Sequence, residues 1–177
     1  MVELLGPPDH PPGAFSSWEE VMELALVEAK LAATRGEVPV GAVLLDAGGA
    51  VVSAACNQPI GKNDPTGHAE IRALRRAARR IGNYRLPGTV LVVTLEPCLM
   101  CLGALIHARV AGLVFAAADP KSGAVRSRLN GAELQWTNHT FWTLEGVLAG
   151  RSSALLQSFF RARRQRQNLQ QPLENKG

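Results

Sequence analysis

The sequence predicts a single α/β domain in which helices cover a mixed β-sheet. Short apolar runs alternate along the chain with segments whose apolar residues recur at helical spacing, a rhythm typical of a sheet flanked by helices. Two of the apolar runs are joined by a short Gly-rich turn, so at least one pair of strands is antiparallel. With 177 residues, 46% of them hydrophobic, the chain is long enough for one domain with a substantial core.

The first elements are a helix and a hairpin. Ser17 is expected to cap a helix, with Glu20 as the second member of a capping box, and Gly36 ends that helix. Residues 40–45 are a short apolar strand, and the turn after them returns the chain as a second strand over residues 50–56.

The middle of the chain adds a helix, a strand and another helix. Residues 57–67 are rich in Pro, Gly, Asn and Asp and are expected to be a loop, after which residues 68–81 form a helix. Residues 89–95 are β-branched and almost entirely apolar, which predicts a central strand buried on both faces. Pro97 suits the first position of the next helix, which runs to about Arg109.

The last third of the chain continues the alternation. Residues 112–116 are predicted as a strand and residues 117–140 as a long loop region. Residues 140–145 form a short edge strand, and an amphipathic helix over residues 150–166 closes the domain.

Composition divides the chain into a domain and two polar or proline-rich ends. Residues 16–166 form the domain, residues 1–15 are expected to be a disordered Pro-rich lead, and residues 167–177 a polar tail. No apolar run approaches the roughly 20 residues of a transmembrane span. The N-terminus lacks the basic start of a signal peptide. We therefore expect a cytoplasmic protein with no membrane partner.

Basic residues are concentrated in two stretches of a chain whose net charge is only +4. Clustered positive charge suits a polyphosphate partner, whereas the ordinary alternative is the solvated face of a helix, and the first stretch favours that alternative because it follows the candidate catalytic residues on their own helix. The stretches are Arg72, Arg75, Arg76, Arg79 and Arg80, and Arg161, Arg163, Arg164 and Arg166.

Three side chains occur at the spacing of a catalytic zinc site. His68, Cys98 and Cys101 supply three ligands and leave the fourth zinc position open, as in catalytic rather than structural sites. On one turn of helix the two cysteine sulfurs would face the same way. The alternatives for this pair are a redox dithiol or half of a structural zinc knuckle, but a second Cys-x-x-Cys is absent from the sequence. Cys56 is interpreted as a buried apolar filler.

Glu70 lies two residues from His68 and can reach the same cavity without being a ligand. Water on zinc ionises near neutral pH. Glu70 would take a proton from that water and hand it to the ring nitrogen and then to the leaving amine. The pattern His-x-Glu…Pro-Cys-x-x-Cys is the general signature of zinc nucleobase deaminases, so it predicts hydrolytic deamination of an aromatic amidine.

Further motifs between residues 37 and about 165, nearly three quarters of the chain, narrow this class. The most specific are the Asp-x-Lys-x-Gly segment at residues 119–123 and the Phe-Phe-Arg-x-Arg-Arg run at residues 159–164. With them the chain resembles the bacterial tRNA-specific adenosine deaminases of the zinc-dependent cytidine and deoxycytidylate deaminase superfamily. The other matching segments are residues 37–43, 57–61, 64–71, 83–86, 94–101 and 103–107.

The resemblance implies a fold, an assembly and a substrate. The fold is the three-layer α-β-α cytidine deaminase-like fold, with a mixed five-stranded sheet flanked by helices. The assembly is a homodimer with one Zn²⁺ per subunit. The reaction is the conversion of adenosine to inosine at the wobble position (34) of an arginine tRNA, which binds through its anticodon stem-loop.

The resemblance also implies roles for residues outside the zinc site. Asn57 is expected to hydrogen-bond the flipped nucleoside, and Val38 and Pro59 to wall its pocket. Gly67 and Ala118 depart from the family pattern, and Ala118 removes a possible phosphate contact. The expected RNA contacts are Lys121, Asn138, Phe160, Arg161, Arg163 and Arg164.

Two other functions compete with this one. A zinc deaminase of free nucleobases or nucleosides, such as guanine or cytosine, would use the same catalytic residues but would not need the C-terminal arginines. A non-catalytic zinc protein that only binds RNA would be expected to have lost Glu70. For Phe159 and Phe160, packing of one ring into the core is the ordinary alternative to RNA contact.

Overall fold

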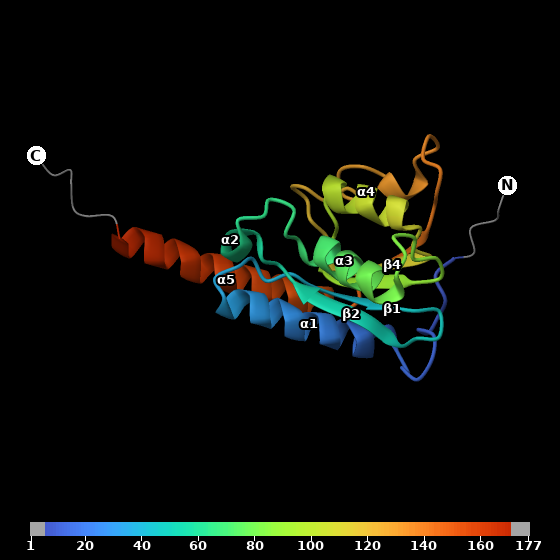
Figure 1. The fold of residues 1–177 in the computed structure, drawn as a ribbon. Coiled ribbons are helices and arrows are strands. Elements are labelled where there is room, and N and C mark those ends of the chain that lie inside the picture. Colours follow the sequence, from blue (N-terminus) through green and yellow to red (C-terminus); the bar gives the residue numbers. More distant parts are fainter. Residues whose placement is uncertain (1–5, 171–177) are drawn as a thin grey trace, which may run out of the picture.

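The computed structural model describes residues 6–170 as a five-stranded sheet between two layers of helices (Figure 1). The order across the sheet is β2-β1-β3-β4-β5. This arrangement confirms the predicted mixed α/β class. The strands are β1 (Gly41–Leu45), β2 (Val51–Cys56), β3 (Val90–Leu95), β4 (Gly112–Ala117) and β5 (Trp142–Glu145).

The sheet is antiparallel on one side of β3 and parallel on the other. β1 pairs antiparallel with both β2 and β3, whereas β3, β4 and β5 run parallel. β3 lies at the centre, and its first five residues are buried, as its apolar sequence predicted. The parallel pair β3 and β4 is joined through a helix that crosses one face of the sheet, which is the usual solution for parallel neighbours.

Each face of the sheet is covered by two long helices (Figure 1). α1 (Trp18–Thr34) and α5 (Ala149–Gln170) pack on one face, and α3 (Ala69–Ile81) and α4 (Leu99–Ala108) on the other. The two apolar cores are separate, because alternate residues of the strands point to opposite faces. None of the helices within residues 6–170 has the length and apolar character needed to cross a membrane.

Two helix starts differ in detail from the sequence prediction. Ser17 does cap α1, but the Glu20 carboxylate binds the backbone and hydroxyl of Ser16 rather than completing the box with Ser17. α4 begins at Leu99 with Cys98 as its N-cap, so Pro97 precedes the cap instead of occupying the first helical position. The shift of two residues brings Cys98 to the very start of the helix.

Two elements are longer or more ordered than expected. The loop after β2 contains a short helix, α2 (Pro59–Lys62), which begins at a proline. α5 continues to Gln170, four residues beyond the expected end, because its exposed residues favour helix. The remaining part of the expected polar tail lies outside the described residues.

The proline-rich lead, where we expected disorder, packs against the domain from residue 8 onward. The Trp18 indole donates to the Pro8 carbonyl at 3.0 Å. The backbones at Pro12 and Gly49 approach so closely that a Cβ on Gly49 would lie 1.9 Å from the Pro12 oxygen. Glycine in the β1–β2 turn therefore makes room for the lead, a long-range contact that composition does not reveal. Residues 1–5 lie outside the described part.

Candidate active site

The site is built where two helices start on the same face of the sheet. His68 is the N-cap residue of α3, and Cys98 is the N-cap residue of α4. Cys101 lies one turn into α4 and is fully buried. β2 feeds the loop that leads to His68, and β3 feeds directly into Cys98. The two strand ends therefore carry the predicted ligands to one place.

The three predicted ligand atoms form a small triangle. The His68 Nδ1 lies 3.7 Å from the Cys98 Sγ and 3.6 Å from the Cys101 Sγ, and the two sulfurs are 3.8 Å apart. Tetrahedral zinc with ordinary bond lengths requires about 3.8 Å between two sulfurs and about 3.6 Å between sulfur and nitrogen. The triangle therefore fits zinc. Within residues 6–170 no second cluster of this kind occurs.

The same distances argue against a closed disulfide. Both cysteines are free, and their sulfurs are far beyond the roughly 2.05 Å of an S–S bond. Among the protein groups alone, hydrogen bonds from Cys101 and then His68 lower the pKa of the Cys98 thiol to about 3, although burial opposes this. The contact with Cys98, together with burial, raises the pKa of Cys101. The trio thus already favours a thiolate, the form that binds metal.

Glu70 lies beside the ligand triangle in a buried position. It is only 3% exposed, and its Oε2 has no hydrogen-bond partner among the residues that the structure describes. Burial raises the pKa of this carboxyl, and its charge also contributes to the shifts of His68 and Cys101. An orphaned buried carboxyl oxygen is costly in a folded protein. Its position next to a metal-binding triangle explains why the cost is tolerated.

Asn57 ties the end of β2 to the start of α3. Its backbone N–H donates to the Val40 carbonyl at 3.0 Å, and its side-chain oxygen accepts the Ala69 N–H at 2.8 Å. This orientation leaves the side-chain NH₂ as the free donor. Pro59 opens α2 two residues further on, and Val38 is half-buried against the core under α3.

Two buried glutamates were missed by sequence reasoning. Glu37 is 1% exposed and accepts the backbone N–H groups of Ile60 at 3.3 Å and Gly61 at 2.7 Å. Glu96, directly before Pro97, is 2% exposed and binds the backbone of the loop after β4. Both glutamates lie inside matched motifs, but nothing in their spacing indicated that their partners are backbone amides.

The predicted RNA residues on α5 face two grooves rather than one. Lys121 lines a groove together with Phe160, Arg161 and Arg164, which we call the Lys121 groove. Its lining is completed by Leu156 and Gln157. Phe160 is 39% exposed there, so it does not serve as the core anchor of the helix.

Arg163 faces the other side of α5. It lines a groove with Phe159, Arg166 and Ile60 of α2, closed by the end of α1, which we call the Ile60 groove. Phe159 is only half-buried, so the ordinary alternative of one core phenylalanine is wrong for both rings. Because Ile60 follows Pro59, this groove connects α5 with the segment expected to wall the nucleoside pocket.

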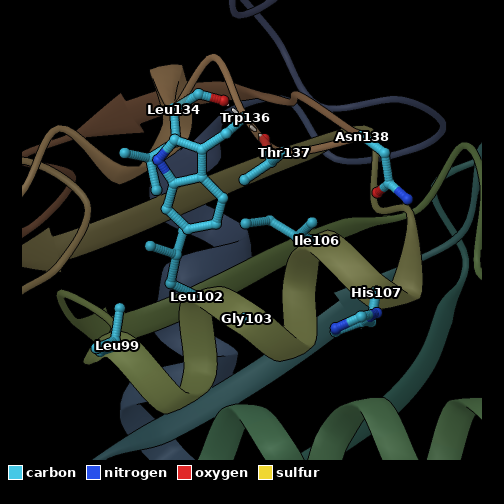
Figure 2. A pocket seen from close by; sticks show the side chains of 9 residues that line it. All are labelled: Leu99, Leu102, Gly103, Ile106, His107, Leu134, Trp136, Thr137 and Asn138. Atoms are coloured by element: carbon cyan, nitrogen blue, oxygen red, sulfur yellow. Dashed lines mark hydrogen bonds between the residues drawn. The ribbon is translucent and has the colours of Figure 1, made fainter.

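Asn138 is not part of either groove. It lies beside His107 at one end of a third, largely apolar groove along α4, while Leu99 lies at the opposite end (Figure 2). The Trp136 ring stands over this groove and is 80% exposed. The structure therefore places Asn138 apart from Arg161, Arg163 and Arg164, the other polar residues of the predicted RNA surface.

The arginines of α3 bind the protein's own backbone. The guanidinium groups of Arg72, Arg76 and Arg80 donate to the carbonyls of Cys56, Ala54 and Val52, respectively, the last at 3.0 Å. These carbonyls belong to β2, the edge strand of the sheet. Arg75 pairs with the Asp64 carboxylate at 3.4 Å, so four of the five basic residues in this stretch have a partner within the protein.

Comparison with known proteins agrees with the fold and the site. A family model for the cytidine and deoxycytidylate deaminase zinc-binding region matches residues 16–117. The tRNA-specific adenosine deaminase of Haemophilus influenzae is 45% identical over 155 residues, covering 88% of this chain and 90% of that protein. The enzyme of the same name from Agrobacterium fabrum is 45% identical over 144 residues, covering 81% and 93%.

A solved structure gives the same result in three dimensions. It comes from studies of A-to-I editing by tRNA:A34 deaminases at the wobble position of transfer RNA. It superposes with a TM-score of 0.75 at 43% identity and covers 77% of this chain and 98% of that one. The protein belongs to the cytidine and deoxycytidylate deaminase family of zinc-binding enzymes, and within it to the tRNA-specific adenosine deaminases.

Proposed function

We propose that this enzyme deaminates adenosine to inosine at wobble position 34 of an arginine tRNA. The observation that carries the chemistry is the buried, unpartnered Glu70 carboxyl beside a ligand triangle of zinc dimensions. The choice of substrate is supported by the names of the relatives and by the basic grooves on α5.

His68, Cys98 and Cys101 would hold a zinc ion, which would supply the Lewis acidity that makes water a nucleophile at neutral pH. Glu70 takes a proton from the water that adds to C6 of the purine ring, and passes it to N1 of the ring. Glu70 then takes the second proton, from the hydroxyl now on C6, and passes it to the amino group; the C6–N bond breaks, ammonia leaves, and the C6 carbonyl of inosine forms. Burial raises the pKa of the Glu70 carboxyl, which makes its carboxylate form a stronger base than an exposed glutamate.

The base is held by the residues around the end of β2. The Asn57 NH₂ donates to the flipped nucleoside, because its carbonyl oxygen is already engaged by the Ala69 N–H. Val38 and Pro59 form apolar walls. A base in a folded stem-loop can reach this site only after it leaves its stack.

The RNA backbone follows α5 through the Lys121 groove and the Ile60 groove. Each groove combines arginines with a phenylalanine ring, the pairing of phosphate contact and stacking surface found in single-strand binding sites. Arg161 and Arg164 serve the first groove and Arg163 the second. Asn138 contacts the RNA from the end of the groove along α4, apart from the residues of α5.

We also propose a cytoplasmic homodimer. The apolar groove along α4 exposes Leu99 (64%) and Trp136 (80%), and a second copy of the chain would remove this apolar surface from water (Figure 2). Light scattering should give twice the chain mass, and Trp136→Glu should shift the protein toward monomer. A parent protein that is monomeric at micromolar concentration contradicts this assembly.

The decisive experiment measures inosine in an arginine tRNA that carries adenosine at position 34. Free adenosine, cytidine and guanine are assayed in parallel, and Glu70→Gln is the matched variant because it keeps the side-chain shape. We expect inosine only in the tRNA and only with the parent protein, while the variant still binds zinc. Turnover of a free base or nucleoside without turnover of tRNA would favour the competing deaminase function and would leave the α5 arginines as a solvated face.

A further inference from the structure

The Glu96 carboxylate is a hub for the loop after β4. Its Oε1 accepts the backbone N–H groups of Val125 at 3.1 Å, Arg126 at 2.7 Å and Ser127 at 2.8 Å. Its Oε2 accepts the Asp119 N–H at 3.0 Å and the Ser127 hydroxyl. All of these donors come from a single loop of nine residues, 119–127.

The hub also joins this loop to the metal-binding helix. Gly123 pairs with Cys98 in an isolated β-bridge, and the Ala124 N–H donates to the Pro97 carbonyl at 2.9 Å. A Cβ on Gly123 would lie only 2.3 Å from the Glu96 carboxyl group. The loop is therefore closed around Glu96 so tightly that it excludes even one methyl group.

The outer part of the loop carries Lys121. Its backbone N–H and that of Ser122 bind the Asp119 carboxylate at 3.0 and 3.2 Å, so the turn is rigid on its own side as well. The exposed Lys121 side chain lines the Lys121 groove opposite Phe160 and Arg161. β3 ends at Leu95, immediately before the hub, so the lysine is held indirectly by the centre of the sheet.

We propose that Glu96 is a positioning residue for RNA: it fixes the 119–127 loop so that Lys121 completes the groove on α5. The inference rests on the proposed function, since it assigns the lysine to an RNA contact. Five hydrogen-bond donors converge on the two carboxylate oxygens, and only a side chain whose two terminal atoms are both acceptors can satisfy all of them. Glutamine has the same shape, but its NH₂ would face at least two of these donors. The charge, rather than the volume, is what the loop requires.

The test compares Glu96→Gln with Glu133→Gln in the full-length, zinc-loaded protein. Glu133 is the control because its carboxylate binds the side chains of Arg126 and Asn130 at the surface and accepts none of the backbone N–H groups that Glu96 binds. The readouts are zinc content, amide hydrogen exchange of Val125–Ser127 without RNA, and the kcat and KM for an anticodon stem-loop.

For Glu96→Gln we expect full zinc content and amide exchange at least about tenfold faster, as follows from losing charge-assisted hydrogen bonds. The KM should rise about tenfold while kcat changes less than about threefold, because none of the groups that the Glu96 carboxylate binds belongs to Glu70 or to the ligand triangle. Glu133→Gln should match the parent. Loss of zinc, or a fall in kcat at unchanged KM, would show that Glu96 supports the metal centre instead, and would overturn the proposal.

A double-mutant cycle with Lys121→Ala identifies the path of the effect. If Glu96 acts through the lysine, the two substitutions should not add, and Glu96→Gln should have little further effect on KM in the Lys121→Ala background. Additive effects would contradict the proposal.

If Glu96→Gln does not fold, two milder variants test the same loop. Ser127→Ala removes one of the five hydrogen-bond donors to Glu96, and Gly123→Ala should loosen the loop because a Cβ there would meet the Glu96 carboxyl group. The exchange measurements need no RNA. A parent enzyme that is inactive on tRNA would therefore contradict the proposed function, while the exchange rates would still show whether Glu96 holds the 119–127 loop.

Discussion

Two of the three metal ligands occupy positions that usually stabilise a helix. His68 and Cys98 are the N-cap residues of α3 and α4, yet neither side chain makes a capping hydrogen bond. A serine or aspartate at such a position typically contributes about 1 kcal/mol of helix stability. The chain forgoes that contribution at two helix starts, because the same positions direct a ring nitrogen and a sulfur at one metal. Their N-terminal location also favours the ionised thiol.

This arrangement predicts different outcomes for two cysteine substitutions. Cys98→Ser should lower the bound zinc from about one per chain to near zero, because a serine hydroxyl is a poor substitute for a thiolate ligand. Cys56→Ser is the control, since Cys56 is buried outside the triangle and its sulfur lies within 3.8 Å of the Arg35 and Arg72 guanidinium groups. It should retain zinc. Elemental analysis measures both, and a full zinc content in Cys98→Ser would refute the ligand assignment.

At the level of residues, sequence and structure agree where function fixes the spacing. The positions of His68, Glu70, Cys98 and Cys101 could be predicted, because metal chemistry restricts the residue types and the spacing within a helical turn. The roles of Glu37 and Glu96 could not, because their partners are backbone N–H groups in remote loops. Every residue except proline carries such a donor, so no side-chain pattern identifies it.

α3 and β2 show how a helix can close the edge of a sheet. The arginines at positions 72, 76 and 80 are one helical turn apart, about 6 Å along the axis, and the carbonyls they bind are two strand residues apart, about 6.6 Å. The two repeats nearly match, so one face of the helix follows the strand. An open edge strand offers unpaired carbonyls to another chain, and arginines that bind those carbonyls prevent this.

The edge arginines lead to a prediction about self-association. Replacing Arg76 and Arg80 together by methionine keeps most of the aliphatic stem but removes the donors to Ala54 and Val52. We expect concentration-dependent assembly beyond the parent's own state, detected by light scattering, with unchanged affinity for the RNA stem-loop. Arg79→Met, one residue off this face of α3, should behave as the parent. A loss of RNA affinity in the double variant, without assembly, would instead assign these arginines to RNA.

The elements themselves were largely predictable because patterns of burial follow the period of each structure. Every predicted strand is present, and the ends of β1 to β5 differ by at most two residues from the prediction. α2 was missed because four residues are too few for a periodic signal. The role of the α3 arginines was also beyond the sequence, which does not say which strand lies at the edge.

In the whole molecule, the candidate metal centre and the grooves that we propose for RNA lie in different parts of the fold. The ligand triangle lies at the starts of α3 and α4 on one face of the sheet, whereas α5 packs on the other face and runs past the sheet (Figure 1). Side chains from Arg161 to Leu169 are all exposed. The alternation of elements predicted the layers, but the projection of α5 depends on its length, which was underestimated.

This layout predicts a specific salt dependence. Replacing Arg161, Arg163 and Arg164 by alanine should weaken stem-loop binding and reduce the slope of log K against log salt by about 2, if each contacts one phosphate of single-stranded RNA. Thermal stability and zinc content should stay at the parent values, because the three side chains are exposed. Binding titrations at several salt concentrations measure the slope. A parallel shift without a change in slope would mean that these arginines do not contact phosphate.

The overhang of α5 has a consequence for how such an enzyme can change over time. The first turns of the helix are anchored to the sheet, where the Ser152 hydroxyl donates to the Thr94 carbonyl. The side chains of the last turns, residues 161–169, are exposed and do not pack in the core. Under the proposed function, substitutions there would alter which RNA is held with little cost in folding, because the side chains are exposed. The range of RNAs could therefore drift under selection through the last turns of α5 while the catalytic layer stays constant, since those turns share no buried side chains with it.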